Sequence, residues 1–93
     1  MELIVIMDPF QSTTDSPLAP AQNCFYVTPH DTAPLPVVTK SIYIGQGGDL
    51  SLIPLRGDTP VTFRNLPDGG MLDVRARAIL ATGTTAADLV GLA

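Results

Sequence analysis

The sequence of 93 residues contains one cysteine, one histidine and no tryptophan. A disulfide within the chain needs two cysteines, and a structural metal site ordinarily needs four ligands of the Cys or His type. Neither is therefore expected to stabilise the fold. The usual groups of nucleophilic and metal-assisted catalysis are equally scarce. We expect a protein that is not an enzyme and that uses no cofactor.

Charge is also scarce. Only 15% of the residues are charged, against about 25% in an average soluble domain, whereas 45% are apolar. The net charge of −4 and the lack of a Lys/Arg cluster argue against nucleic acid and against an anionic membrane surface. A single domain of this size leaves a large share of its surface exposed. We therefore expect another chain to cover part of it, as in a homo-oligomer.

The longest apolar run, Leu3–Met7, is far shorter than the roughly 20 residues that span a bilayer. Glu2 stands where a signal peptide carries positive charge, so no secretion signal is expected. The unpaired cysteine fits synthesis in the cytoplasm. Cys24, beside Phe25, is interpreted as a small buried hydrophobic residue.

Residues 1–39 contain no Lys, Arg or Gly but six of the nine prolines. We interpret residues 1–23 as an extended N-terminal arm and residues 24–93 as a small all-β domain. The apolar run in the arm is expected to bind a partner, because disordered tails are poor in large apolar residues. The candidate partner-binding residues are Leu3, Ile4, Val5, Ile6, Phe10, Arg75 and Arg77.

A period of two, typical of half-buried strands, runs through residues 37–45 and again through 49–55. The glycines between them, Gly45, Gly47 and Gly48, predict a hairpin turn rather than a phosphate-binding loop, because a strand and not a helix follows. Further short strands are expected at 25–28 and 60–65, and a longer strand at 71–81. Residues 86–92 are expected to form a last strand or a short helix.

Turn signals every 8–12 residues then predict a small antiparallel β-sandwich or barrel. On the long strand predicted at 71–81, Arg75 and Arg77 would share one face with Asp73. That face would be a solvated charged surface or a row of salt bridges between subunits. His30 and Asp31 are interpreted as loop residues, with Asp31 capping a turn, and not as an acid–base pair.

Four blocks of the chain resemble the head spike base protein family of phage-like gene transfer agents and related tailed phages, over residues 25–92. The blocks are Phe25-Tyr-Val-Thr-Pro-His-Asp31, Leu35-Pro-Val-Val-Thr-Lys-Ser-Ile-Tyr-Ile-Gly-Gln-Gly-Gly-Asp49, Gly57-Asp-Thr-Pro-Val-Thr-Phe-Arg-Asn-Leu-Pro-Asp-Gly-Gly-Met-Leu-Asp-Val-Arg75 and Leu80-Ala-Thr-Gly-Thr-Thr-Ala86. Their order is more specific than any block alone.

This resemblance implies a structural virion protein on the head surface, assembled in the bacterial cytoplasm. It would attach to capsid protein at the vertex and carry a spike fibre that binds host capsule polysaccharide. Because a vertex is five-fold, a pentamer is the expected oligomer. Two alternatives remain open: a carbohydrate-binding module that contacts capsule polysaccharide directly, and a capsid decoration or connector protein. Tyr26 and Tyr43 would belong to a sugar-binding face in the first of these, or to sheet packing otherwise.

Overall fold

The computed structural model describes residues 14–93, which contain strands and no helix, so the predicted all-β fold is confirmed. Val27, Ile42, Ile44, Leu50, Leu52, Ile79 and Leu89 are the larger members of one buried core. The strands are β1 (Cys24–Tyr26), β2 (Ser41–Gln46), β3 (Gly48–Pro54), β4 (Val61–Leu66), β5 (Gly70–Leu72), β6 (Ala76–Ile79) and β7 (Ala87–Leu92).

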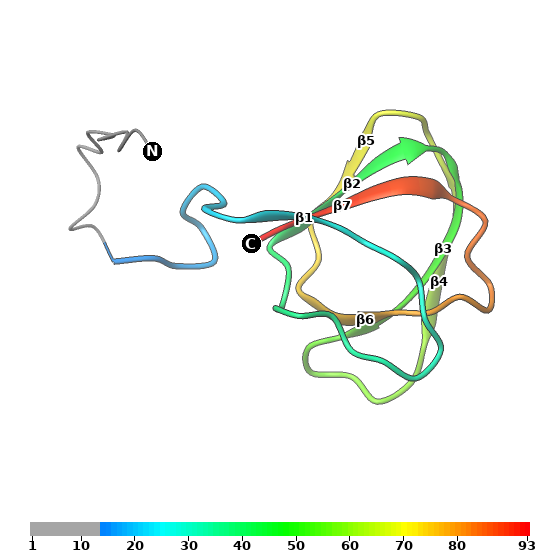
Figure 1. The fold of residues 1–93 in the computed structure, drawn as a ribbon, viewed down its shortest axis with the longest axis horizontal. Coiled ribbons are helices and arrows are strands. Elements are labelled where there is room, and N and C mark those ends of the chain that lie inside the picture. Colours follow the sequence, from blue (N-terminus) through cyan, green and yellow to red (C-terminus); the bar gives the residue numbers. More distant parts are fainter. Residues whose placement is uncertain (1–13) are drawn as a thin grey trace, which may run out of the picture.

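Two antiparallel sheets enclose this core (Figure 1). The first sheet has the order β1-β7-β2-β5, and the second has the order β4-β3-β6. Alternation along β2 turns Ile42 and Ile44 inward and Ser41 and Tyr43 outward, as the period of two predicted. The molecule is therefore a small sandwich that is barrel-like, because single segments pass from one sheet into the other.

The hairpin predicted between residues 37–45 and 49–55 is wrong. β2 and β3 follow each other directly but lie in different sheets: β2 pairs with β5 and β7, and β3 with β4 and β6. The glycines between them form a corner instead of a reversal. Gly48 has a φ of 150°, and a Cβ at this residue would stand 2.7 Å from the Thr85 hydroxyl oxygen. Alternation reports the faces of a strand but not its partner, which explains the error.

The long strand predicted at residues 71–81 is also wrong, because residues 73–75 interrupt it. β5 belongs to the first sheet and β6 to the second, so the interruption is another crossing between sheets. Thr39, which is fully buried, stabilises this crossing: its hydroxyl donates to the Val74 carbonyl oxygen (2.8 Å) and accepts from the Ala76 N–H (3.0 Å). Of the two structures expected for residues 86–92, the strand is the one formed.

The described part of the arm, residues 14–23, leads away from the sheets at the end where the C-terminus lies (Figure 1). The amides of Gln22 and Asn23 donate to the Ala93 carbonyl oxygen, at 2.6 and 2.8 Å, and the Ala93 amide donates back to Asn23. These bonds continue the pairing of β1 with β7. The division of the chain at residue 23 stays a prediction, because residues 1–13 lie outside the described part.

Candidate docking surface

Four apolar side chains form a row across the outer face of the first sheet. Tyr26, Val90, Tyr43 and Met71 are directly opposite one another in successive strands, β1, β7, β2 and β5. Tyr26 is 90% exposed, Met71 53% and Tyr43 40%, whereas Val90 is half-buried. We call these four residues the outer row. Cross-strand neighbours on one face lie about 5 Å apart, so the row is a continuous apolar surface.

A second row lies beside it, formed by Cys24, Leu92 and Ser41 in β1, β7 and β2. The Ser41 hydroxyl donates to the Asp73 carboxylate at 2.6 Å, which gives this row one polar end. Cys24 is exposed, so its interpretation as a buried hydrophobic residue is wrong. The reason is its place in β1: the neighbouring Phe25 takes the inward position, where its ring covers Gly91, and alternation turns Cys24 outward.

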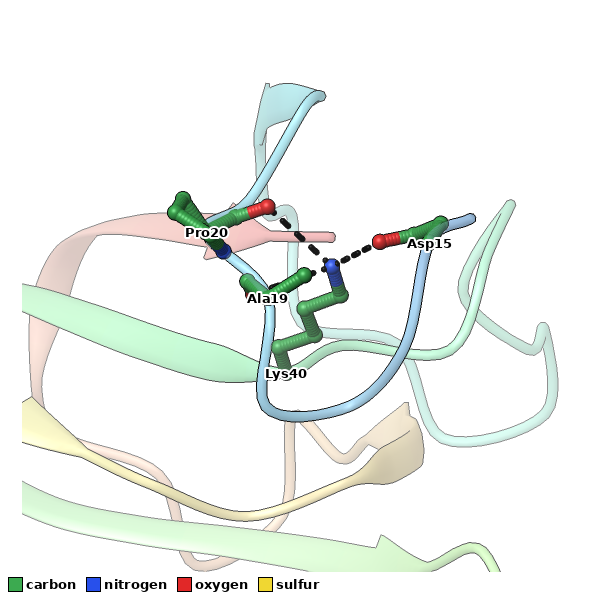
Figure 2. Close-up of polar contacts among 4 residues, drawn as sticks. All are labelled: Asp15, Ala19, Pro20 and Lys40. Carbon is green, nitrogen blue, oxygen red and sulfur yellow. Dashed lines mark hydrogen bonds and ion pairs between the residues drawn. The ribbon is translucent and has the colours of Figure 1, made fainter. Parts of the chain in front are cut away.

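Lys40 attaches the arm to the end of this sheet (Figure 2). Its side chain is only 11% exposed, and its ammonium contacts the Asp15 carboxylate at 2.5 Å and the carbonyl oxygens of Ala19 and Pro20, both at 3.2 Å. The hydrogen bond from Lys40 lowers the pKa of Asp15. The Lys40 ammonium thus contacts three residues of a segment that otherwise forms a single turn. In that turn the Ala19 amide donates to the Ser16 carbonyl oxygen.

Two hollows adjoin the outer face of the first sheet, one beside the outer row and one beside the second row. One, of about 230 Å³, is lined by Cys24, Phe25, Tyr26 and Val90 at the β1 edge. The other, of about 380 Å³, lies between the arm segment 17–21 and the residues Lys40, Ser41, Asp73 and Leu92. Both are therefore continuous with the outer face and lie next to the arm.

The predicted partner-binding residues fall into two groups. Leu3, Ile4, Val5, Ile6 and Phe10 lie outside the described residues. Arg75 is exposed and lies between β5 and β6, whereas Arg77 is half-buried in β6 and donates from Nη2 to the Gly57 carbonyl oxygen at 2.9 Å. Arg77 also lies 3.7 Å from the Asp58 carboxylate. The structure therefore assigns Arg77 a contact within its own chain, and the predicted contact with a partner is untested.

His30 and Asp31 have structural partners, as their interpretation as loop residues implies. His30 Nδ1 accepts the amides of Thr32 and Ala33, at 3.0 and 2.9 Å. Asp31 accepts from the backbone amide and the hydroxyl of Thr82, both at 2.8 Å, and these bonds lower the pKa of its carboxyl. Asp31 thus ties its loop to the turn that the Thr84 amide closes on the Ala81 carbonyl oxygen.

Within residues 14–93, no group of three or more His, Cys, Asp or Glu side chains is arranged to hold a metal ion. The same part of the chain has no helix long and apolar enough to cross a membrane. The sequence analysis did not predict the outer row or the contact of Lys40 with the arm. The position of Tyr43 on one face of its strand was visible as alternation. Its alignment with Tyr26 depends on strands far apart in the chain.

No protein-family model and no curated protein matches the sequence. Among solved structures, the chain is similar to a chain of a structure described as the capsid of a native GTA particle (a gene transfer agent) computed with C5 symmetry. The two chains are 34% identical and superpose with a TM-score of 0.82, and the match covers 94% of this chain and 100% of the other. A capsid is a structural assembly and not an enzyme. At this identity over the full length of its relative, the chain belongs to the same family and is a structural virion protein of the gene transfer agent type.

Proposed function

We propose that the chain is the base of a head spike, which attaches a receptor-binding fibre to the capsid vertex. The observation that carries the proposal is the full-length match to a chain of a gene transfer agent capsid computed with C5 symmetry. Five-fold axes of a capsid lie at its vertices, and a protein seated there naturally has five copies. The order of the four sequence blocks supports the same position. The fibre, and through it the host capsule polysaccharide, would be the outward partners, and capsid protein would be the inward one.

The surface of the chain fits an assembly subunit. Tyr and Met are enriched at protein interfaces, and Tyr26, Tyr43 and Met71 of the outer row are all exposed. That row contains no charged side chain. Two cations elsewhere, Lys40 and Arg77, make their hydrogen bonds within the chain. A contiguous apolar face of this kind is typical of a surface that another protein covers. We therefore propose a pentamer that assembles in the bacterial cytoplasm and is mounted on the particle head.

The native mass of the purified chain tests the oligomer. Five subunits of 9.8 kDa give about 49 kDa, which light scattering distinguishes readily from a monomer or trimer. A trimer would contradict the vertex base and favour a fibre-like role. Location on the particle is tested by cryo-electron microscopy of particles decorated with a Fab against the chain. Density at vertices is expected, whereas Fab density on the faces of the head or at the tail junction would identify a decoration or connector protein.

A carbohydrate-binding module is the second candidate, favoured by one observation. Both tyrosines of the chain, Tyr26 and Tyr43, belong to the exposed outer row, and exposed aromatic rings on a sheet can stack against sugars. The chain has no tryptophan, so tyrosine fluorescence reports this face directly. Titration with capsule polysaccharide should leave the fluorescence of the isolated chain unchanged if it is a spike base. Saturable quenching that Tyr26→Ala abolishes would favour the module instead.

A further inference from the structure

Among residues 14–93, strand β1 has β7 on one side and no strand on the other, so it is an edge of the first sheet. Its pairing with β7 uses the backbone groups of alternate residues: Asn23 and Val27 donate to Ala93 and Leu89, and Phe25 is opposite Gly91. In an antiparallel pair, the residues between these point their N–H and C=O groups away from the partner. Cys24 and Tyr26 therefore direct backbone donors and acceptors to the open side, beside the hollow of about 230 Å³.

The other three edges within residues 14–93 are less accessible to an added strand. The edge at β6 is covered by the loop between β1 and β2, where the amides of His30 and Leu35 donate to the carbonyl oxygens of Ile79 and Arg77. β4 carries the exposed Arg64, and Asn65 interrupts it with a φ of 59°. Charge and irregular backbone at an edge both oppose further pairing. β5 lies between two exposed acids, Asp68 and Asp73.

The edge at β1 has none of these protections. Its residues, Cys24-Phe25-Tyr26, carry no charge and no proline, and two of the three side chains are exposed. Unpaired, uncharged edges pair readily with an extended segment of another chain. The occupant that the chain itself offers is Leu3–Met7, an uncharged apolar run of strand length. A strand of five residues spans about 17 Å and exceeds the three residues of β1.

We propose that Leu3–Met7 of a neighbouring copy adds to the first sheet as a fifth strand at the β1 edge. The inference rests on the proposed oligomer. Lys40 holds Asp15 beside the sheet, and the eight residues from there to Met7 reach about 26 Å when extended, enough to cross to an adjacent subunit. The described arm points away from its own sheets (Figure 1), which favours a neighbour over a return to the same copy. Alternate side chains of the added strand then continue the outer row beyond Tyr26.

A cysteine scan tests the proposal, because Cys24 lies on β1 and is the only cysteine of the chain. Five full-length variants carry one cysteine each (L3C, I4C, V5C, I6C or M7C) together with C24S. Each is mixed with the wild-type chain and treated with a short bis-maleimide. Any link to Cys24 then joins two copies. Because side chains of a strand alternate between its faces, we expect efficient links at every second position, either 3, 5 and 7 or 4 and 6.

A negative control and a pair of matched substitutions accompany the scan. A cysteine at the exposed Thr59, in the loop before β4, should give no link above background. Tyr26→Asp should slow the linking about tenfold, the factor for a contact worth about 1.4 kcal/mol. Because Tyr26 is 90% exposed, the fold of the subunit should be insensitive to this change. Val61→Asp, on the edge strand β4 of the other sheet and 44% exposed, should leave the rate unchanged.

The outcomes separate this proposal from the proposed function. A pentamer whose five positions link equally, or not at all, overturns the added strand and leaves the spike base intact. A monomeric native mass without links contradicts both. A variant that has the arm cysteine and keeps Cys24 can also form links within one chain. If links form only in this way, the added strand comes from the same copy and the proposal of a neighbouring copy is overturned. Protection of Cys24 by capsule polysaccharide, without links, assigns the edge to sugar and also overturns the proposal.

Discussion

Replacing Thr39 by valine should destabilise the fold more than replacing it by serine, although valine is the more hydrophobic residue. Thr39 is fully buried, and its hydroxyl bridges the Val74 carbonyl oxygen at 2.8 Å and the Ala76 N–H at 3.0 Å. Valine has the same shape but can make neither bond. Two backbone groups would then lose their partner at the crossing between the sheets, and a buried polar group without a partner costs about 1–3 kcal/mol.

The magnitudes can be compared directly. The extra methyl of valine recovers about 0.8 kcal/mol, so Thr39→Val should cost about 2 kcal/mol net. Thr39→Ser keeps both hydrogen bonds and loses one methyl group, which costs about 1 kcal/mol. Thr39→Ala loses both the hydroxyl and the methyl group and recovers nothing, so it should cost about 4 kcal/mol.

Thermal unfolding followed by circular dichroism measures the order. About 2 kcal/mol corresponds to roughly 10 °C in Tm for a domain of this size, so the variants are well resolved. We expect Tm to fall in the order wild type, Thr39→Ser, Thr39→Val, Thr39→Ala. A Thr39→Val protein as stable as Thr39→Ser would refute the reasoning, because it would mean that the hydroxyl does not hold the crossing.

Three further predictions concern the arm and the corners. Lys40→Met keeps the aliphatic stem but removes the ammonium, so amide hydrogen exchange in residues 16–20 should accelerate about tenfold. Arg64→Met, which removes an exposed cation, should leave this exchange rate unchanged. The pKa of Asp15 is lowered in the folded protein, so its contact with Lys40 contributes stability at pH values above the usual 3.8. This contribution is lost as the pH falls through the lower folded pKa. An NMR titration that shows no lowering of the Asp15 pKa would contradict this. Gly47→Ala should lower the Tm more than Gly69→Ala. A Cβ at Gly47 would stand 2.2 Å from the Leu66 carbonyl oxygen, which should cost about 1–3 kcal/mol. A Cβ at Gly69 would meet only the Tyr43 hydroxyl oxygen at an ordinary 3.8 Å, so the strain of its φ of 70° remains, about 1 kcal/mol. Equal Tm values for the two alanine variants would argue against crowding at the corner.

Local patterns in the sequence determined the fold class and much of the inward and outward orientation. Ile42 and Ile44 were predicted opposite Ser41 and Tyr43, and β2 has this arrangement because a period of two is a property of each strand alone. The scarcity of catalytic groups likewise predicted that the protein is not an enzyme, in agreement with its capsid relative. The alternation predicted from residue 37 holds only from Ser41, where β2 begins. Thr39 precedes the strand and is fully buried, and its hydroxyl is hydrogen-bonded to the backbone of Val74 and Ala76.

Only the tertiary structure decided which strands pair. β2 and β3 are neighbours in sequence, yet β2 pairs with β7, more than 40 residues away, because the corner at Gly48 directs β3 into the other sheet. The outer row exists only through these long-range registers, and the Lys40 contact exists only because the arm runs past the start of β2. Hydrogen bonding between strands is insensitive to sequence order, so spacing along the chain could establish each strand but not its neighbours.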